Sequence, residues 1–208
     1  MQDPALSHTL LLASSSPRRL ELLGRTGYHC VVRVPKVDES RRAGEPPADY
    51  VARLAQAKAE GVEAVPDIPV VVAADTVVTL GAEILGKPAD ETEARRVLSA
   101  LAGTRHTVLT GFVVARLGEL TPAEVVRTTV QFKPLSDHEI DCYVATGEWL
   151  DKAGGYGAQS RAAFLVEALY GSYTNIVGLP LAEVVDRLAR LGVVPSAAAM
   201  AAAAEARA

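Results

Sequence analysis

A carboxylate interrupts a strongly apolar stretch of the chain. Asp75 follows five apolar residues, 70–74, and is followed by Thr76 and two valines. Such a stretch predicts a buried β-strand, and an unpaired carboxylate inside it would cost several kcal/mol. We therefore expect Asp75 to face a cavity, a metal ion or a network of hydrogen-bond donors. The alternative is the common role of Asp as a turn or cap residue at a strand end.

Four basic residues are placed where they could bind an anion. Arg18 and Arg19 fall in the first turn of a helix predicted to begin after Ser16. Cations there oppose the helix dipole, and a bound anion would remove the conflict. Lys58 falls on the apolar stripe of another predicted helix, and Lys87 lies in a Gly-Lys-Pro turn. The alternatives are two solvated surface arginines and a lysine that extends from the edge of its stripe.

Three further features of the sequence are also compatible with a bound anion. Ser14 precedes the first helix, Glu39 follows another carboxylate in a Val-Asp-Glu segment, and residues 151–159 are rich in glycine. Glycine allows the backbone to approach a ligand closely, although glycine clusters are more often simple turns. Scattered cations with carboxylates suit a polyphosphate held through a divalent metal ion, with one carboxylate free to orient or deprotonate water.

Several other kinds of protein are disfavoured. Residues 81–87, GAEILGK, have the spacing of a phosphate-binding P-loop, but residue 88 is Pro and has no hydroxyl for magnesium. The four histidines lack the spacing of metal ligands, and no serine lies in a GxSxG motif. The net charge is −4, with acidic and basic residues interspersed, which disfavours a nucleic-acid-binding protein.

The composition also indicates where the protein works. We expect Cys30 and Cys142 to be reduced thiols, because they are far apart and in no paired motif. No apolar run reaches the length of a membrane span, and the first residues lack the basic and apolar regions of an export signal. We therefore expect a cytoplasmic protein with no membrane partner, folded as one domain or as two small lobes sharing one core.

The apolar patterns alternate between strand and helix, which predicts an α/β fold. We expect strands at 9–13, 28–34, 70–78, 104–117 and 124–133, the last two antiparallel, and helices at 17–24, 48–63, 90–103, 136–147 and 178–192. A hairpin around Gly171 is expected over 164–177. The alanine-rich segment 195–208 is expected to be frayed or disordered, because it has few apolar side chains with which to dock.

Seven motifs, in order along the chain, resemble the Maf family of nucleoside triphosphate pyrophosphatases: ASSSPRR, VDE, ARLAQAKA, AADTVV, ILGKP, DKAGGYGAQ and GSYTNIVGLPL. The resemblance covers about residues 10–191. It implies a Maf-like domain over 1–194, followed by the low-complexity tail 195–208. The implied fold is a two-lobed single α/β domain around a mixed, twisted β-sheet with flanking helices, similar to inosine triphosphatases, with the ligand cleft between the lobes. A cytoplasmic enzyme that is often a homodimer and uses Mg²⁺ or Mn²⁺ is implied as well.

The resemblance also implies a role for each matching residue. Asp75 would be the proton acceptor and would bind the metal together with Glu39. The residues implied around the phosphates are Ser14, Arg18, Lys58 and Lys87. In the branch of the family that acts on dTTP and UTP, substrate choice depends on the positions matched here by Arg18, Thr76 and Gln159.

The resulting hypothesis is an enzyme that hydrolyses dTTP and UTP to the monophosphate and pyrophosphate. Such an enzyme would remove unwanted nucleotides from the pool, with a link to arrest of cell division. Two alternatives stay open. One is a nucleotide-binding sensor that inhibits septum formation and has little turnover, and the other is the same enzyme acting on modified nucleotides.

Overall fold

In the part of the chain that the structure describes, the five strands predicted from the apolar runs are joined by two further strands in one mixed sheet. The computed structural model describes residues 8–195 and 197–205. The strands are β1 Thr9–Ala13, β2 His29–Val32, β3 Val70–Leu80, β4 Glu83–Leu85, β5 Arg105–Arg116, β6 Glu124–Phe132 and β7 Val166–Tyr170. Their order is β2-β1-β3-β5-β6-β7, with β4 paired to β3. The predicted α/β class and mixed sheet are confirmed.

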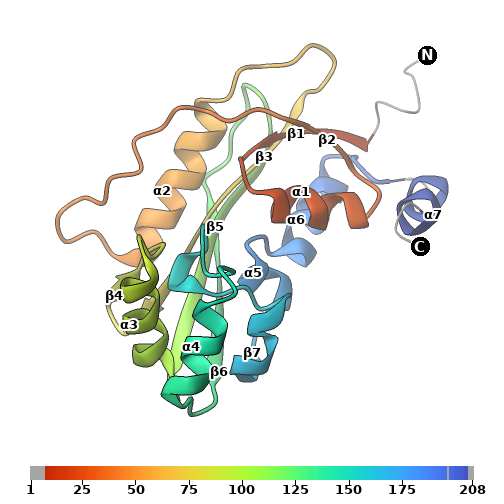
Figure 1. Ribbon diagram of the computed structural model, residues 1–208. Helices are drawn as coiled ribbons and strands as arrows, with labels where there is room; N and C mark the ends of the chain where they lie inside the picture. The colour runs from red at the N-terminus through yellow and green to blue at the C-terminus, as the bar shows by residue number, and fades with distance from the viewer. Residues whose placement is uncertain (1–7, 196, 206–208) are drawn as a thin grey trace.

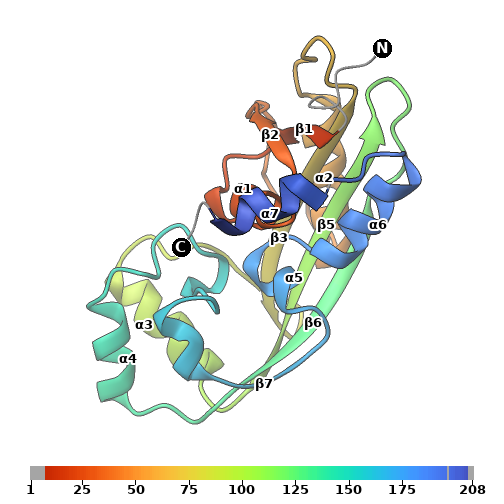
Figure 2. The ribbon, with the colours of Figure 1, turned by 90° about the vertical axis from the view of Figure 1, so that its right-hand side faces the viewer.

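Parallel and antiparallel pairing divide the sheet into two parts. β1 is parallel to both β2 and β3, whereas β3, β5, β6 and β7 are antiparallel to one another in turn. β3 and β5 have 11 and 12 residues, so they run through both halves of the molecule (Figure 2). Residues at the middle of β3, including Asp75, therefore lie where the two halves meet.

The first half buries both faces of its strands. On one face Leu10 and Leu12 pack toward α1, Pro17–Arg25, and α6, Leu181–Arg190. On the other face Leu11 and Ala13 pack toward α2, Pro47–Glu60. Figure 1 shows α2 on one side of the long strands and α1 and α6 on the other. This arrangement explains why β1 and β3 read as continuous apolar runs.

The second half is built around α3, Glu91–Leu101, and α4, Asp137–Val144. Asp90 caps α3 by accepting from Glu93 N, and Ser136 forms a full capping box with Glu139 at the start of α4. Both helices pack on β3, β5 and β6 through a core that includes Leu98, Leu101, Val130, Phe132 and Tyr143. The other predicted helices and strands before residue 164 are confirmed with ends shifted by a few residues, as is α6.

The predicted hairpin over 164–177 is wrong. A 3₁₀ segment, Arg161–Leu165, leads into β7, and β7 pairs with β6 and not with the residues after it. Residues Tyr173–Val177 form the short helix α5, which Ser172 caps by accepting from Asn175 N. Gly178, with a φ of 121°, ends it. Five residues are too few for helical periodicity to show in the sequence, so the cap and the glycine were the available signals.

The expectation of a frayed tail is also wrong for residues 197–205; residues 196 and 206–208 of that prediction lie outside the described part. Ala197–Glu205 form α7, which lies beside α1 (Figures 1 and 2). A Cβ at Gly27 would lie 3.1 Å from the backbone nitrogen of Met200, so the glycine leaves room for this helix. Long-range contact of this kind has no local sequence signal.

Two further observations concern the thiols and the helices of the described residues. Cys30 and Cys142 are both free thiols, as predicted. In the described ranges we find no helix that combines the length and the apolar character needed to cross a membrane.

Candidate active site

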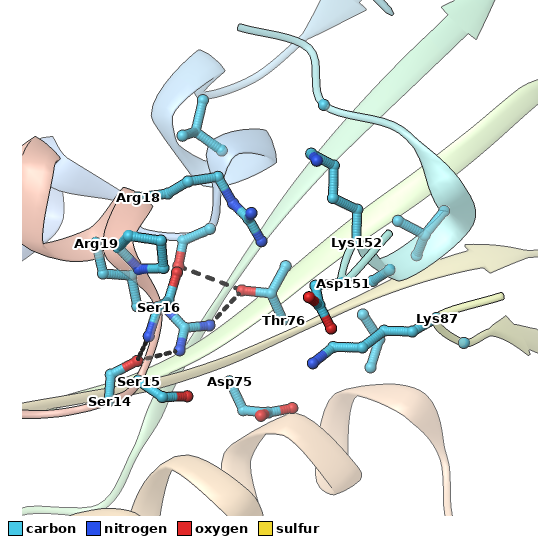
Figure 3. Close-up of a pocket in the computed structure, with 18 of the residues that line it drawn as sticks. Ser14, Ser15, Ser16, Arg18, Arg19, Asp75, Thr76, Lys87, Asp151 and Lys152 are labelled. Atoms are coloured by element: carbon cyan, nitrogen blue, oxygen red, sulfur yellow. Dashed lines mark hydrogen bonds between the residues drawn. The ribbon is translucent and has the colours of Figure 1, made fainter. Parts of the chain in front are cut away.

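The two halves of the molecule enclose a cleft of about 800 Å³. Its walls come from the end of β1, the start of α1, α2, the middle of β3, the turn after β4 and the glycine-rich segment 151–159 (Figure 3). Residues predicted from six separate parts of the sequence all line it: Ser14, Arg18, Glu39, Lys58, Asp75, Thr76, Lys87 and Gln159. The predicted cleft is therefore present, and it contains every predicted site residue.

A lysine joins the two predicted metal-binding carboxylates. Lys58 Nζ lies 2.7 Å from Asp75 Oδ1 and 2.8 Å from Glu39 Oε1. The side chains of Lys58 and Asp75 are only 12% and 13% exposed, whereas Glu39, in the loop after β2, is 59% exposed. Within the described residues Oδ2 of Asp75 has no hydrogen-bond partner. One oxygen of Asp75 is thus held by the ammonium, and the other remains available in the cleft.

A glycine allows Lys58 to reach Asp75. In the sheet Asp75 of β3 stands opposite Gly111 of β5. A Cβ on Gly111 would overlap the backbone carbonyl of Val51 in α2. The helix therefore lies directly on the bare backbone of β5, which places Lys58, two turns after Val51, beside Asp75. Sequence reasoning missed Gly111, although a glycine inside a long predicted strand is a known sign of close backbone approach.

Arg19 forms hydrogen bonds within the protein. It is buried, and its guanidinium donates to Gly178 O at 2.7 Å, Ser14 Oγ at 2.9 Å and Thr76 Oγ1 at 3.0 Å. Burial lowers its pKa from the ordinary value. Arg19 therefore ties the end of β1 to β3 and to the end of α5. Its sequence-based interpretation as a free anion ligand did not foresee these contacts.

Two predicted substrate residues already have partners inside the protein. The buried hydroxyl oxygen of Ser14 accepts from Arg19 and, at 3.2 Å, from Ser16 N, which leaves its own proton for a ligand. Thr76 Oγ1 accepts from Arg19 and lies 2.9 Å from Thr110 Oγ1 and 3.3 Å from Gly178 O. The Thr76 proton can thus be donated within the protein, and the hydroxyl can offer a lone pair to the cleft.

The remaining cations of the cleft have no acidic partner. In the part of the chain that the structure describes, no ion pair is formed by Arg18, Arg19, Lys87 or Lys152. Burial lowers the pKa of Arg18, and the nearby charge of Asp151 opposes that shift. Cations that are partly buried without a carboxylate are unfavourable unless a bound anion compensates them. The cleft is therefore suited to a multiply charged anion.

Arg18 and Gln159 also line a small hollow beside the main cleft, together with Tyr173 and Val177. The guanidinium and the amide are donors of fixed geometry, and the aromatic and aliphatic groups offer flat apolar surface. Thr76 lines the adjoining cleft, as does Val177. The three residues predicted to select the base are thus brought to connected parts of one site.

The carboxylates suit a metal ion that arrives with its substrate. Within residues 8–195 and 197–205, no group of three His, Cys, Asp or Glu could hold a metal by itself. Magnesium in phosphate-transferring enzymes is often bound by one or two carboxylates, with substrate phosphates and waters completing the octahedron. Asp75 and Glu39, brought together on Lys58, supply that number of oxygen ligands.

The chain is similar to proteins whose family is known. The model of a family described as Maf-like protein matches residues 9–191. A dTTP/UTP pyrophosphatase of Anaeromyxobacter dehalogenans is 53% identical over 186 residues, 88% of this chain and 94% of that protein. A protein of the same name from Geotalea uraniireducens is 49% identical over 188 residues, 89% and 96% of the two chains. A solved dITP/XTP pyrophosphatase of Mycobacterium abscessus gives a TM-score of 0.38 at 16% identity, over 61% of this chain and 75% of that one.

Proposed function

The chain belongs to the Maf family, and we propose that it is a nucleoside triphosphate pyrophosphatase that hydrolyses dTTP and UTP to the monophosphate and pyrophosphate. The relatives at about half identity that carry this activity in their names support the substrate class. The observation that carries the proposal is the cleft itself. Among the described residues, five cationic and three acidic side chains line it, on a chain whose net charge is −4.

Asp75 is the proposed base. Its Oδ1 is fixed by Lys58, so the carboxylate has a defined orientation, and its Oδ2 is available to accept a proton from an attacking water. The 2.7 Å contact with the Lys58 ammonium holds the carboxylate in place before a substrate arrives. Arg18 and Lys87, which have no acidic partner in the described residues, would neutralise the charge that develops on the leaving pyrophosphate.

Mg²⁺ or Mn²⁺ would be held by Asp75 and Glu39 together with phosphate oxygens of the nucleotide. When bound, such an ion polarises a phosphoryl oxygen and screens charge between the phosphates and the carboxylates. Lys58 keeps the two carboxylates within reach of one another before the substrate arrives.

The choice of a pyrimidine base would depend on Arg18, Thr76 and Gln159. Thymine and uracil present one ring N–H between two carbonyl oxygens. A lone pair of the Thr76 hydroxyl suits the N–H, and the side-chain N–H groups of Arg18 and Gln159 suit the carbonyls. A base whose edge has a different order of hydrogen-bond donors and acceptors would leave one of these side chains unpaired. Such unpaired groups are the usual source of strong discrimination between substrates.

The experiment that tests this function is pyrophosphate release by the purified protein with Mg²⁺ or Mn²⁺. The substrates would be dTTP, UTP, CTP, dGTP, 5-methyl-UTP and 7-methyl-GTP. We expect dTTP and UTP to be preferred, and 5-methyl-UTP to report on modified pyrimidines. Binding of nucleotides without turnover of any of them would contradict the enzyme and favour a sensor. A cytoplasmic location, a homodimer and a link to cell division are implied by the family resemblance alone and stay predictions.

A further inference from the structure

Lys152 is a cation of the cleft that the sequence motifs did not single out by itself. It lies near the start of the glycine-rich segment, and its ammonium donates to the backbone oxygens of Glu148 and, at 3.4 Å, of Leu150. An ammonium has three N–H groups, so one is left for the cleft. Among the described residues no carboxylate lies within ion-pair distance of it. Lys152 is therefore fixed in position with its charge uncompensated.

The aliphatic side chain of Lys152 packs against the backbone of Gly157, which carries no Cβ. A Cβ at residue 157 would stand 2.8 Å from Cε and 3.1 Å from Cδ of Lys152. The backbone of Gly157 is not in the left-handed region, unlike that of Gly154 and Gly155, so its conformation does not call for glycine. The close approach of Lys152, and to a lesser degree that of Ser160 Oγ at 3.1 Å, explains the absence of a side chain there.

Lys152 and Arg18 face each other across the cleft (Figure 3). Burial lowers the pKa of Lys152 from its ordinary value, and the charge of Arg18 acts in the same direction. Glu148 and Asp151 oppose this shift, but only in part. Two partly desolvated cations on opposite walls repel each other. A polyanion bound between them would attract both, which would offset this repulsion.

We infer that Lys152 is a further phosphate-binding residue of this site, which with Arg18 holds the polyphosphate of the substrate from the side opposite Asp75, and that Gly157 is glycine so that Lys152 can take up this position. The inference rests on the proposed function for its substrate class. Lys152 would contact phosphate oxygens directly, whereas Gly157 would act only through Lys152.

The test is binding of inorganic pyrophosphate, in the presence of Mg²⁺, to the full chain by calorimetry. Loss of a charged hydrogen bond to phosphate should weaken pyrophosphate binding about 10–100-fold in Lys152→Met, and Lys152→Arg should restore part of it. Lys36→Met is the matched control for loss of one positive charge, because Lys36 is exposed and does not line the cleft; it should bind as the wild type does. Thermal unfolding of each variant confirms that it folds.

Gly157 provides the second arm. Gly157→Ala should weaken pyrophosphate binding in the wild-type background, because the new methyl group displaces the flexible end of Lys152 and not the backbone. In the Lys152→Met background the same substitution should have little further effect, since the two residues act as a unit. An equal effect in both backgrounds would contradict a role for Gly157 through Lys152.

The outcomes separate this inference from the proposed function. Wild-type pyrophosphate affinity in folded Lys152→Met, or no pyrophosphate binding by the wild type, would overturn the role of Lys152. A wild-type protein that binds pyrophosphate tightly, loses that binding in Lys152→Met and hydrolyses no nucleotide would support Lys152 and refute the pyrophosphatase activity.

Discussion

Replacing Lys58 with Met should destabilise the protein mainly through Asp75. Lys58 Nζ contacts Asp75 and Glu39 at nearly equal distances, 2.7 and 2.8 Å, but the two carboxylates are 13% and 59% exposed. Removing one partner of a buried ion pair costs about 3–5 kcal/mol because the other charge is left unpaired, whereas an exposed pair contributes about 0–1 kcal/mol. Asp75 retains some contact with solvent, so we expect Lys58→Met to lower the free energy of unfolding by about 2–4 kcal/mol.

Urea unfolding of four variants would measure these contributions. Glu39→Gln should lower the free energy of unfolding by less than about 1 kcal/mol, because the Glu39 carboxylate is exposed in its ion pair with Lys58. The double variant Lys58→Met/Asp75→Asn should recover most of the loss of Lys58→Met, since a neutral amide needs no cation, with Asp75→Asn alone completing the cycle. An equal loss for Glu39→Gln and Lys58→Met, or no recovery in the double variant, would refute the claim that Lys58 chiefly serves the buried carboxylate.

Three further predictions concern the framework of the site. Gly111→Ala should lower the free energy of unfolding by at least about 2 kcal/mol, because the new methyl group overlaps the backbone of α2; Gly24→Ala, with open space around it, is the control for urea unfolding. Burial lowers the pKa of His106 from 6.5 to about 4, so below pH 6.5 the unfolded chain binds a proton that the folded chain does not. Stability should therefore fall by up to about 3 kcal/mol as pH drops from 6.5 to about 4, and unfolding at several pH values should show a flatter profile for His106→Phe. Truncation after residue 194 removes α7 and should lower Tm by less than about 4 °C with unchanged dTTP turnover; a larger drop would show that α7 protects the core.

The sequence predicted the cleft better than it predicted the contacts inside it. Residue types such as an Asp in an apolar strand or a Lys on an apolar stripe signal that a polar group must find a partner. They do not say which one. Lys58 and Asp75 are 17 residues apart and meet only because Gly111, on a third element, lets α2 approach the sheet. The partners of Arg19 are hidden in the same way, since Gly178 lies 159 residues further along the chain.

The errors in the fold have a similar origin. The short helix α5 is too brief to show a period, and its glycine neighbours suggest a turn. The alanine-rich segment docks beside α1 where Gly27 leaves room for Met200, and local sequence patterns cannot connect these two residues. The long amphipathic helices and long strands were predicted correctly because their patterns repeat several times within the element itself.

The most direct test of the central claim is the rate of dTTP hydrolysis by Asp75→Asn, measured together with dTTP affinity. If Asp75 is the base, turnover should fall about 10²–10⁴-fold while the variant remains folded and still binds dTTP. Turnover close to that of the wild type would contradict the account and leave Asp75 as only the structural partner of Lys58.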